Sequence, residues 1–412
     1  AMARLGCLVA AVALVLVAAG VAQQVPVQNV LDFGATGNGH TKDTDAINAA
    51  IAACADIEGE CEVLFPEGQY LTAPFNLTSY LNVVISEGAE ILGSEDEEDY
   101  PIVAPFPSYC QGREMDGPRY GPLVGGNNLT NVALYGGGTI DGQGAKWWRM
   151  HDDGLLNYTR PRLVEFMYGE GIVLEGLTIK NSPFWTIHPY SCNDVVVRNC
   201  TVTALASSPN TDGIDPDSST NVLVEDCTIA VSDDCISVKS GLDYCGRQYD
   251  VASANITVRR CVLINCDGLA IGSEMSGGVY NVTFEDNEAR FVEDLVRFKT
   301  GRGRGGVVSD VFYRNNTLKV GAERGIHYDM YYTSGPPTNA TATPVIQNVF
   351  IDGLHGVAAM AGYYECLPES PCEANLKDVD IVGLPYRCQN VYGNATDCKP
   401  RMCYCHEPNC GV

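Results

Sequence analysis

Short alternations of apolar and polar residues recur along most of this chain of 412 residues. The segment NVLVEDCTI, residues 221–229, is typical of a half-buried strand, in which successive side chains point to opposite faces. Comparable segments begin 23 to 40 residues apart, at Asn131, Gly171, Asp194, Asn221, Asn255, Asn281, Asp310 and Asn348. The shortest interval fits one turn of a parallel β-solenoid, and the longer ones indicate loops inserted at the corners.

Each repeated unit is too small to fold alone, so a core forms only when the units stack on one another. We therefore predict an all-β fold, a single-stranded right-handed parallel β-helix. A two-sheet sandwich is the alternative, but it favours hairpin turns at shorter spacing. The 43 glycines agree with a chain that turns often.

The N-terminal part departs from the repeat. Residues 30–39 are predicted to form a strand that runs into a glycine-rich turn, and residues 43–54 a helix with Asp43 or Thr44 as its N-cap. The apolar stripe of this helix consists of Ile47, Ala50, Ile51 and Cys54. Because a solenoid has an apolar end that must be covered, we predict that the helix caps it.

The two ends of the chain set the predicted domain limits. Residues 1–22 hold Arg4, an apolar run and small residues, the pattern of a cleaved signal peptide, and the run is shorter than the ~20 residues that span a membrane. Residues 23–365 form the solenoid. The tail, residues 366–412, has seven cysteines and little periodicity, and we predict a disulfide-stapled C-terminal cover there. The run from Cys403 to His406 leaves metal binding as the alternative for the tail.

Cysteines and glycosylation sequons agree with secretion. The chain has 18 cysteines, and loss of Cys7 with the signal peptide leaves an odd number, so at least one thiol lacks an intramolecular partner. Cys54 and Cys61 are close enough in sequence for a local disulfide. Nine Asn-x-Ser/Thr sequons occur, at Asn76, Asn128, Asn157, Asn199, Asn255, Asn281, Asn315, Asn339 and Asn394.

The formal net charge of −25 excludes some classes of partner. An acidic surface argues against nucleic acid, since phosphate binding needs local positive charge. It also provides no long-range attraction for a polyanionic substrate, which would have to be held by a local basic patch. The densest cationic group consists of Arg297, Lys299, Arg302 and Arg304.

Three aspartates give the first indication of chemistry. Asp212 precedes the pair Asp233-Asp234 by 21 residues, about one turn of the solenoid. Adjacent turns lie ~4.8 Å apart, so the three carboxylates would meet on one face. Clustered carboxylates raise some of each other's pKa values, which suits acid–base hydrolysis of a glycosidic bond. The alternative is that such aspartates form ladders or cap turns, the role we expect for Asp215 and Asp217.

Two predicted insertions carry aromatic residues. Residues 144–165 contain Trp147, Trp148, Arg149 and His151, and residues 323–345 contain His327, Tyr328, Tyr331 and Tyr332. Aromatic side chains in loops beside a carboxylate cluster can stack on sugar rings. The alternative is that they pack their loops onto the solenoid.

A set of motifs then occurs in order: DFGA (32–35), DTDAI (43–47), GTIDGQG (138–144), NSPFW (181–185), NTD (210–212), DD (233–234), IGSE (271–274) and RFK (297–299). Through them, residues 28–355 resemble glycoside hydrolase family 28, the polygalacturonases and their relatives. The resemblance implies a right-handed β-helix that hydrolyses α-1,4 galacturonic linkages of pectin with inversion of the anomeric centre.

The resemblance also implies the roles of the three aspartates. Asp233 is the general acid that protonates the glycosidic oxygen, and Asp212 and Asp234 hold and activate the attacking water. An inverting hydrolase needs its carboxylates ~6.5–9.5 Å apart, which leaves room for that water. Because adjacent residues of an extended strand point to opposite sides, we expect an irregular turn to direct both Asp233 and Asp234 towards the groove.

Arg297 and Lys299 match the family's Arg-x-Lys pair, which contacts the substrate carboxylate. Strand alternation places both side chains on one face, a geometry suited to gripping a uronate. The further predicted substrate contacts are Asn210, Lys239, Asp267, Tyr328 and His188. A hydrogen-bonded structural role is the alternative for His188.

The sequence departs from the family at one position. Typical polygalacturonases carry Gly-His-Gly beside the acid, whereas this chain has Cys266-Asp267-Gly268. If Asp267 lies near Asp233, like-charge repulsion would help to keep the acid protonated. Alternatively, Asp267 only ends a turn.

We thus predict a secreted, extracellular enzyme of the cell wall that acts on pectic polysaccharide as a monomer, without a metal or cofactor. The long corner loops and the Gly-Ser-Glu segment resemble those of exo-acting family members. Rhamnogalacturonan hydrolysis is a second hypothesis, and a non-catalytic pectin-binding protein, motivated by the missing histidine, is a third. Pectate lyases share the β-helix but use Ca²⁺ and eliminate.

Overall fold

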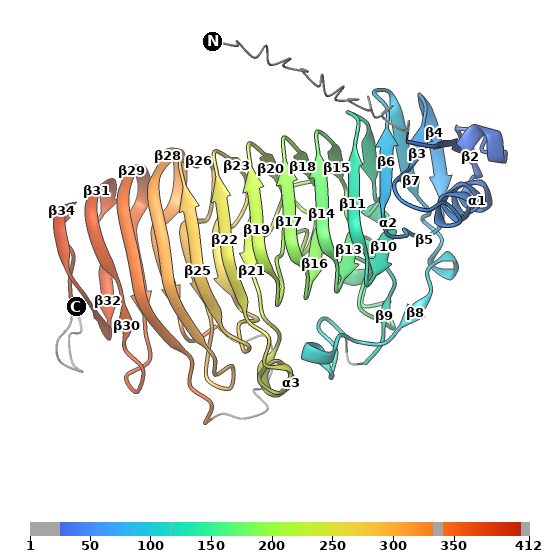
Figure 1. Ribbon diagram of the computed structural model, residues 1–412. Coiled ribbons are helices and arrows are strands. Elements are labelled where there is room, and N and C mark those ends of the chain that lie inside the picture. Colours follow the sequence, from blue (N-terminus) through green and yellow to red (C-terminus); the bar gives the residue numbers. More distant parts are fainter. Residues whose placement is uncertain (1–24, 116, 333–340, 405–412) are drawn as a thin grey trace, which may run out of the picture.

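The computed structural model describes residues 25–115, 117–332 and 341–404, which form one right-handed parallel β-helix. Each coil of the chain lies on the one before, so strands from successive coils pair in parallel along the axis (Figure 1). The predicted fold class is confirmed. All eight predicted repeat starts lie within the strands of a single sheet, one per coil.

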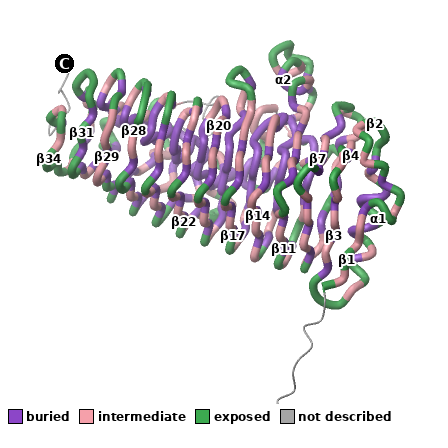
Figure 2. The backbone as a smooth tube through the Cα atoms, turned by 90° about the horizontal axis from the view of Figure 1, so that it is seen from above, coloured by how far each residue is buried: buried purple, intermediate pink, exposed green. Residues whose placement is uncertain are grey.

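That first sheet runs the whole length of the solenoid. Its strands are β1 (Val27–Asn29), β3 (Cys61–Phe65), β6 (Leu81–Ile85), β11 (Thr130–Tyr135), β14 (Glu170–Glu175), β17 (Asn193–Arg198), β19 (Thr220–Glu225), β22 (Ser253–Arg259), β25 (Val279–Glu285), the first parts of β28 (Val307–Asp329) and β29 (Val345–Glu365), β31 (Asn375–Leu384) and β34 (Ala395–Lys399). Inward residues such as Val195 and Val197 are buried, and the residues that alternate with them are more exposed (Figure 2).

Two further sheets complete each coil. The second consists of β2 (Asn38–Lys42), β4 (Gly68–Thr72), β7 (Ala89–Gly93), β12 (Thr139–Asp141), β15 (Thr178–Lys180), β18 (Thr201–Thr203), β20 (Thr228–Ala230), β23 (Val262–Ile264), β26 (Glu288–Arg290) and the middle of β28. The third, which carries the site described below, consists of β5 (Phe75–Asn76), β10 (Val124–Asn127), β13 (Val164–Met167), β16 (Ile187–Tyr190), β21 (Ile236–Val238), β24 (Leu269–Gly272), β27 (Asp294–Lys299), the last parts of β28 and β29, and β32 (Arg387–Gln389).

The remaining elements lie at the ends and in insertions. They are α1 (Thr44–Ala55), α2 (Ala145–Asp152), α3 (Asp243–Tyr249), the 3-10 helices η1 (Val30–Phe33), η2 (Glu97–Asp99) and η3 (Pro107–Tyr109), and the short strands β8 (Ile102–Val103), β9 (Arg119–Tyr120), β30 (Cys372–Glu373) and β33 (Val391–Tyr392). In the part of the chain that the structure describes, no helix is long and apolar enough to cross a membrane.

Asparagines at one corner explain why the repeat so often begins with this residue. Asn221, Asn255 and Asn281 have φ of 56°, 57° and 53°, in the left-handed region that asparagine tolerates better than most residues. Their side chains form a ladder between coils, in which Nδ2 of Asn281 donates to Asn255 (2.9 Å) and Nδ2 of Asn255 donates to Asn221 (3.1 Å). The corner therefore fixes the register of each coil on the next.

A second ladder lies inside the solenoid. The buried Asn287 accepts a hydrogen bond from the backbone N–H of Cys261 (3.0 Å) and donates to Asn316 (3.0 Å) on the following coil. Its amide also donates to the carbonyl of Val258 (3.1 Å). These contacts satisfy backbone groups that would otherwise be buried without partners at the turn.

The N-terminal helix is confirmed as α1, with Ala46, Ile47, Ala50, Ile51 and Cys54 buried. Asp43 is its N-cap residue, but the carboxylate accepts hydrogen bonds from the N–H groups of Thr36 and Gly37 instead of from the helix. The predicted strand at residues 30–39 is wrong, because residues 30–33 form η1 while strands flank it on both sides. The predicted disulfide between Cys54 and Cys61 is present.

The predicted limit of the solenoid at residue 365 is also wrong. β31 and β34 continue the first sheet, and β32 continues the third, so the coils run on to Lys399. The cysteines that hid this periodicity form the disulfides Cys366–Cys372 and Cys388–Cys403 within the last coils. The signal peptide predicted at residues 1–22, and His406 of the alternative metal motif, lie outside the described residues.

An insertion between β7 and β10, residues 95–121, crosses the outer face of the third sheet; we call it the strap. It contains η2, β8, η3 and β9, and the disulfide Cys110–Cys245 ties it to α3, which lies beside η3 (Figure 1). Beneath the strap, β16 is buried on both faces. Phe106 of the strap stacks on Tyr190 with ring centroids 4.3 Å apart.

The interior ladder generates a stability prediction. Asn287→Ala leaves the N–H of Cys261 and the carbonyl of Val258 buried without their partners, and we expect it to lower the free energy of unfolding by roughly 3 kcal/mol. The exposed ladder member Asn281 is the control: Asn281→Ala costs about 1 kcal/mol, chiefly through its left-handed φ. Denaturant unfolding of both variants measures the difference. Equal losses would contradict the importance of the interior ladder.

Candidate active site

Three carboxylates converge on the outside of the third sheet. Asp212, Asp233 and Asp234 each place an oxygen within 4.8 Å of the other two. Asp212 lies two residues before Ile214, which bridges in parallel to Ile187 on one coil and to Ile236 on the next. Stacking of adjacent coils therefore brings together side chains that are 21 residues apart in sequence.

Asp233 and Asp234 both belong to the cluster although they are neighbours in sequence. They lie in a bend directly before β21, not in an extended strand. The backbone N–H of Asp234 donates to Oδ1 of Asp233 (2.8 Å), which fixes the bend. The predicted irregular turn is present, and within it Asp234 is fully buried and Asp233 is half-buried.

Two cations of β27 face these carboxylates. Arg297 and Lys299 are two residues apart, so strand alternation points both outwards, as predicted. Lys299 Nζ forms a short ion pair with Asp234, and Arg297 Nε lies 3.8 Å from the other oxygen of the same carboxylate. Asp234 thus has compensating charge on both sides.

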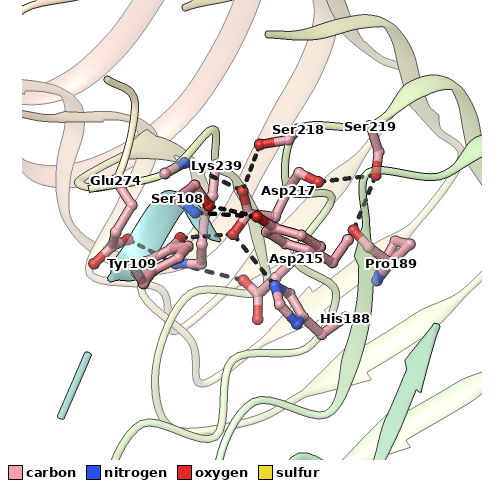
Figure 3. Close-up of polar contacts among 12 residues, drawn as sticks. Ser108, Tyr109, His188, Pro189, Asp215, Asp217, Ser218, Ser219, Lys239 and Glu274 are labelled. Carbon is pink, nitrogen blue, oxygen red and sulfur yellow. Dashed lines mark hydrogen bonds and ion pairs between the residues drawn. The ribbon is translucent and has the colours of Figure 1, made fainter. Parts of the chain in front are cut away.

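A third cation, Lys239, lies next to Asp212. Its Nζ is 3.3 Å from Asp212. The same atom is 3.6 Å from Asp215 and 3.3 Å from Glu274 (Figure 3). Asp215 does not cap an exposed turn; it is fully buried, and burial together with the nearby Asp212 raises its pKa well above the ordinary value. The predicted contact residue Lys239 is 2% exposed, so it acts on the carboxylates around it and offers little surface to a ligand.

The environment of Asp212 favours a retained proton. Burial, followed by the charge of Asp233, raises the pKa of Asp212 to about 7, against the lowering effect of Lys239. Among the described residues, Asp212 Oδ1 and Asp234 Oδ1 have no hydrogen-bond partner. Two buried acceptor oxygens beside a half-buried carboxyl form a site for a polar ligand such as water.

Comparison with known proteins places these features in a family. The family model described as glycosyl hydrolases family 28 matches residues 108–399. The chain is 37% identical to a protein of Vitis vinifera named "Probable polygalacturonase", over 91% of this chain and 79% of that protein. This chain belongs to glycosyl hydrolase family 28.

Solved structures agree with the family. An exopolygalacturonase from Thermotoga maritima superposes with a TM-score of 0.80 at 30% identity, over 90% of this chain and 91% of that one. A polygalacturonase from Erwinia carotovora, at 23% identity and a TM-score of 0.73 over 86% of this chain and 94% of that one, shares the fold. A second model, described as rhamnogalacturonase A/epimerase, pectate lyase-like, matches residues 27–86, which cover the capped end and not the carboxylates.

Asp267, which stands where the family resemblance led us to expect a histidine, lies beside the acidic cluster. Its backbone N–H donates to the carbonyl of Asp233 (2.8 Å), and Oδ2 is 3.5 Å from Arg297 Nη1. Burial, followed by the charge of Asp234, raises its pKa to about 8. The residue does more than end a turn, because its carboxyl lies beside the acidic cluster and its raised pKa favours the protonated form.

Asn210 contacts the cluster directly. Its Nδ2 donates to Asp233 Oδ2 (3.3 Å), and its φ of 54° turns the chain towards Asp212. The carbonyl oxygen of the same side chain accepts a hydrogen bond from the buried Arg160 (2.9 Å). Arg160 was not predicted, because its position in an irregular loop gives no periodic signal.

His188 is structural, so the prediction that it contacts substrate is corrected. The side chain is fully buried under the strap, with Nδ1 3.4 Å from Glu165 and Nε2 3.3 Å from Asp217. The hydroxyl of Tyr109, from the strap, donates to the same Asp217 carboxylate (2.6 Å; Figure 3). Asp217 therefore holds the strap and does not cap a turn.

The predicted sugar contact of Tyr328 is also corrected. β28 continues through residues 323–329, where a loop was expected, and alternation turns Tyr328 inwards. Its side chain is fully buried between Phe298 and Tyr364, with ring centroids 4.3 and 4.9 Å away. The neighbouring residue His327 is the one that faces outwards.

The first aromatic insertion does not form a sugar platform. Residues 145–152 form α2, and both tryptophans are buried. Trp147 packs against Tyr100 and Tyr120, and the indole N–H of Trp148 donates to the carbonyl of Ser182 (2.9 Å). The alternative for this insertion, packing onto the coils, is correct.

Two charged residues near the site were missed as site residues. Glu274, known from the sequence only as part of a motif, is buried and lies 3.3 Å from Lys239. Its second contact is Arg113 of the strap, whose Nε is 2.7 Å away. A pattern could not have linked residues 113 and 274, because only the folded strap brings them together.

The cluster of Asp212, Asp233 and Asp234 is the one group of His, Cys, Asp or Glu side chains, among the residues the structure describes, that could share a cation. The ammonium groups of Lys239 and Lys299 already lie against two of these carboxylates. They provide the positive charge that a metal ion would otherwise supply.

The raised pKa of Asp212 generates a prediction. Its folded-state pKa of about 7 exceeds the ordinary value of 3.8, so the folded protein binds the extra proton between these pH values and loses stability as pH rises through them. Asp212→Asn cannot ionise, and its melting temperature relative to wild type should therefore be higher at pH 8 than at pH 4. The exposed Asp194→Asn is the control and should show no such trend. A difference that falls with pH would contradict the assignment.

Proposed function

We propose that this family 28 enzyme hydrolyses the α-1,4 galacturonic linkages of galacturonan, the polygalacturonase reaction. The observation that carries the proposal is the contact of the carboxylate cluster with Arg297 and Lys299. A uronate carries a carboxylate that cations at the edge of the cluster can bind, whereas a neutral sugar does not. The names of the Vitis vinifera relative and of the Thermotoga maritima structure support the same substrate class.

Asp233 is the proposed general acid. It is the one member of the three that is half-buried and not fully buried, so it can reach the glycosidic oxygen of a sugar in the groove. Asn210 hydrogen-bonds to its Oδ2 (3.3 Å) and orients the carboxyl.

Asp212 and Asp234 are proposed to hold the attacking water. Each has a buried oxygen without a hydrogen-bond partner among the described residues, and two such acceptors can orient one water molecule. The carboxylate of Asp234, held by Lys299, accepts the proton of that water as bond formation proceeds. Arg297 and Lys299 bind the uronate carboxylate at the edge of the same cluster.

Inversion is proposed on the family assignment and not on the carboxyl spacing. The closest oxygens of the three aspartates lie within 4.8 Å, shorter than the ~6.5–9.5 Å typical of inverting pairs. That typical spacing refers to whole carboxyl groups with a water between them, whereas the cluster value joins the nearest atoms. In this scheme Asp212 and Asp234 bind the water and form no covalent bond to the sugar.

The acid assignment is tested by Asp233→Asn. The amide cannot donate a proton to the leaving oxygen in the manner of an acid, so kcat on polygalacturonate should fall roughly a hundredfold to ten-thousandfold with little change in KM. Reducing-sugar release measures the rate. Asp194→Asn, at an exposed corner, is the matched control and should keep wild-type kcat. A variant at position 233 with normal turnover would remove the assignment.

Exo-action is proposed on the position of the strap. It covers β13 and β16, the coils on the N-terminal side of the carboxylates, and Arg119 of the strap pairs with Glu165 beneath it (2.9 Å). Arg113 of the strap reaches Glu274 beside the cluster. A polymer can therefore extend from the cluster only towards the C-terminal coils, and its other end must stop at the strap.

This arrangement predicts the first product. During early turnover of polygalacturonate, the product should be monomeric galacturonate, and proton NMR should find it first as the β-anomer, since inversion of an α linkage gives β. Freeing the strap with Cys110→Ser and Cys245→Ser should shift the products towards oligomers. Oligomers from the wild type would exclude exo-action, and an initial α-anomer would exclude inversion.

We also propose that the enzyme is secreted to the cell wall. Five disulfides among the described residues support an oxidising compartment. Two of them, Cys110–Cys245 and Cys235–Cys266, hold segments next to the carboxylate cluster. A galacturonan substrate of plant cell walls would be met in that same compartment.

A further inference from the structure

The third sheet continues beyond the carboxylate cluster, and its outward side chains form a row. Parallel register aligns Arg297 of β27 with His327 of β28, His327 with Tyr363 of β29, and Tyr363 with Arg387 of β32. We call His327, Tyr363 and Arg387 the outer row. Neighbouring coils lie ~4.8 Å apart, so Arg387 is roughly 14 Å along the axis from Arg297.

Contacts between side chains hold the middle of the outer row. The rings of His327 and Tyr363 stack with centroids 5.9 Å apart and planes inclined by 6°. His327 Nδ1 lies 3.0 Å from Asp294, and the hydroxyl of Tyr363 donates to Glu365 (2.8 Å). The two rings thus form a fixed floor between the catalytic coil and Arg387.

Arg387 differs from most cations of this acidic chain. Its side chain is exposed at the end of the outer row, and within the described residues it has no hydrogen bond or ion pair. Arg297, by contrast, is engaged by Asp234, Asp267 and Glu293. An exposed guanidinium with free donors is suited to a carboxylate ligand.

A second row runs parallel to the outer row and has different chemistry. The same register aligns Lys299 with Asp329, Asp329 with Glu365, and Glu365 with Gln389. Past the catalytic coil, this row offers carboxylates and an amide, which accept hydrogen bonds from sugar hydroxyls and repel a uronate carboxylate. A uronate chain lying along the axis would therefore turn its carboxylates towards Arg387 and its hydroxyls towards Asp329 and Glu365.

We propose that Arg387 is a substrate-binding residue that holds a carboxylate of the galacturonan chain about three coils from the point of cleavage, with the His327–Tyr363 pair as the floor between. The inference rests on the proposed function and extends it, because it names a contact that only a polymer reaches. It agrees with the strap, which leaves the C-terminal coils as the direction in which the polymer extends.

Arg387→Ala tests the inference through a ratio. The kcat/KM for polygalacturonate divided by that for the disaccharide should fall about tenfold, the effect of one charge-assisted hydrogen bond. Arg387→Glu should lower the ratio further, and Arg387→Lys should restore part of it. Arg314→Ala is the matched control: it removes an exposed arginine from β28 in the first sheet, away from the outer row. We expect it to leave the ratio unchanged.

Binding of polygalacturonate, followed by calorimetry in the wild type and Arg387→Ala, separates this inference from the proposed function. Weaker binding by the variant supports the contact even if no hydrolysis occurs, in which case the proposed function fails alone. Hydrolysis by the wild type with an unchanged ratio and unchanged binding in Arg387→Ala overturns the inference and leaves the function intact. An equal loss in Arg314→Ala also overturns it, since the effect would then be one of net charge.

Discussion

Stacking of each coil on the previous one is the constraint on which the rest of this molecule depends. Parallel pairing fixes the distance between coils at the strand spacing. Residues with a left-handed backbone conformation, such as Asn221, Asn255 and Asn281, turn the chain at the same corner each time. The side chains at one position of successive coils then necessarily form a row. Asp212 and Asp234 meet for that reason, and so do the asparagines of the corner ladder and the residues of the outer row.

The same stacking concentrates negative charge at the site, and cations and retained protons compensate it. Six carboxyl groups and four cations lie together around the cluster: Asp212, Asp215, Asp233, Asp234, Asp267 and Glu274, with Arg113, Lys239, Arg297 and Lys299. Buried charge without compensation is costly, so the acidic excess must be relieved by retained protons. The raised pKa values of Asp212, Asp215 and Asp267 are that relief.

The sequence predicted those parts of the structure that arise from repetition. The eight strand starts, the capping helix and the convergence of the three aspartates follow from periods that can be seen along the chain. The errors lie where tertiary contacts override the local pattern. Tyr328 was assigned to a loop, but β28 is long enough to include it. The tail was assigned to a separate cover because its cysteines obscured the strand pattern. Arg113 and Arg160 could not be found from sequence, since irregular segments carry them to the site.

The strap shows how an insertion can be added to a one-dimensional fold without changing the coils that carry the carboxylates. A loop at a corner does not disturb the pairing of the coils, so an insertion between β7 and β10 can cover one side of the cluster while β21, β24 and β27 keep their register. The disulfide Cys110–Cys245 closes a span of 135 residues, which restricts the unfolded chain and holds the strap against α3. Arg113 of the strap contacts Glu274, Glu274 contacts Lys239, and Lys239 contacts Asp212. The strap therefore also contributes to the charge balance around the carboxylates. The strap and the carboxylate cluster are thus connected through one chain of ion pairs.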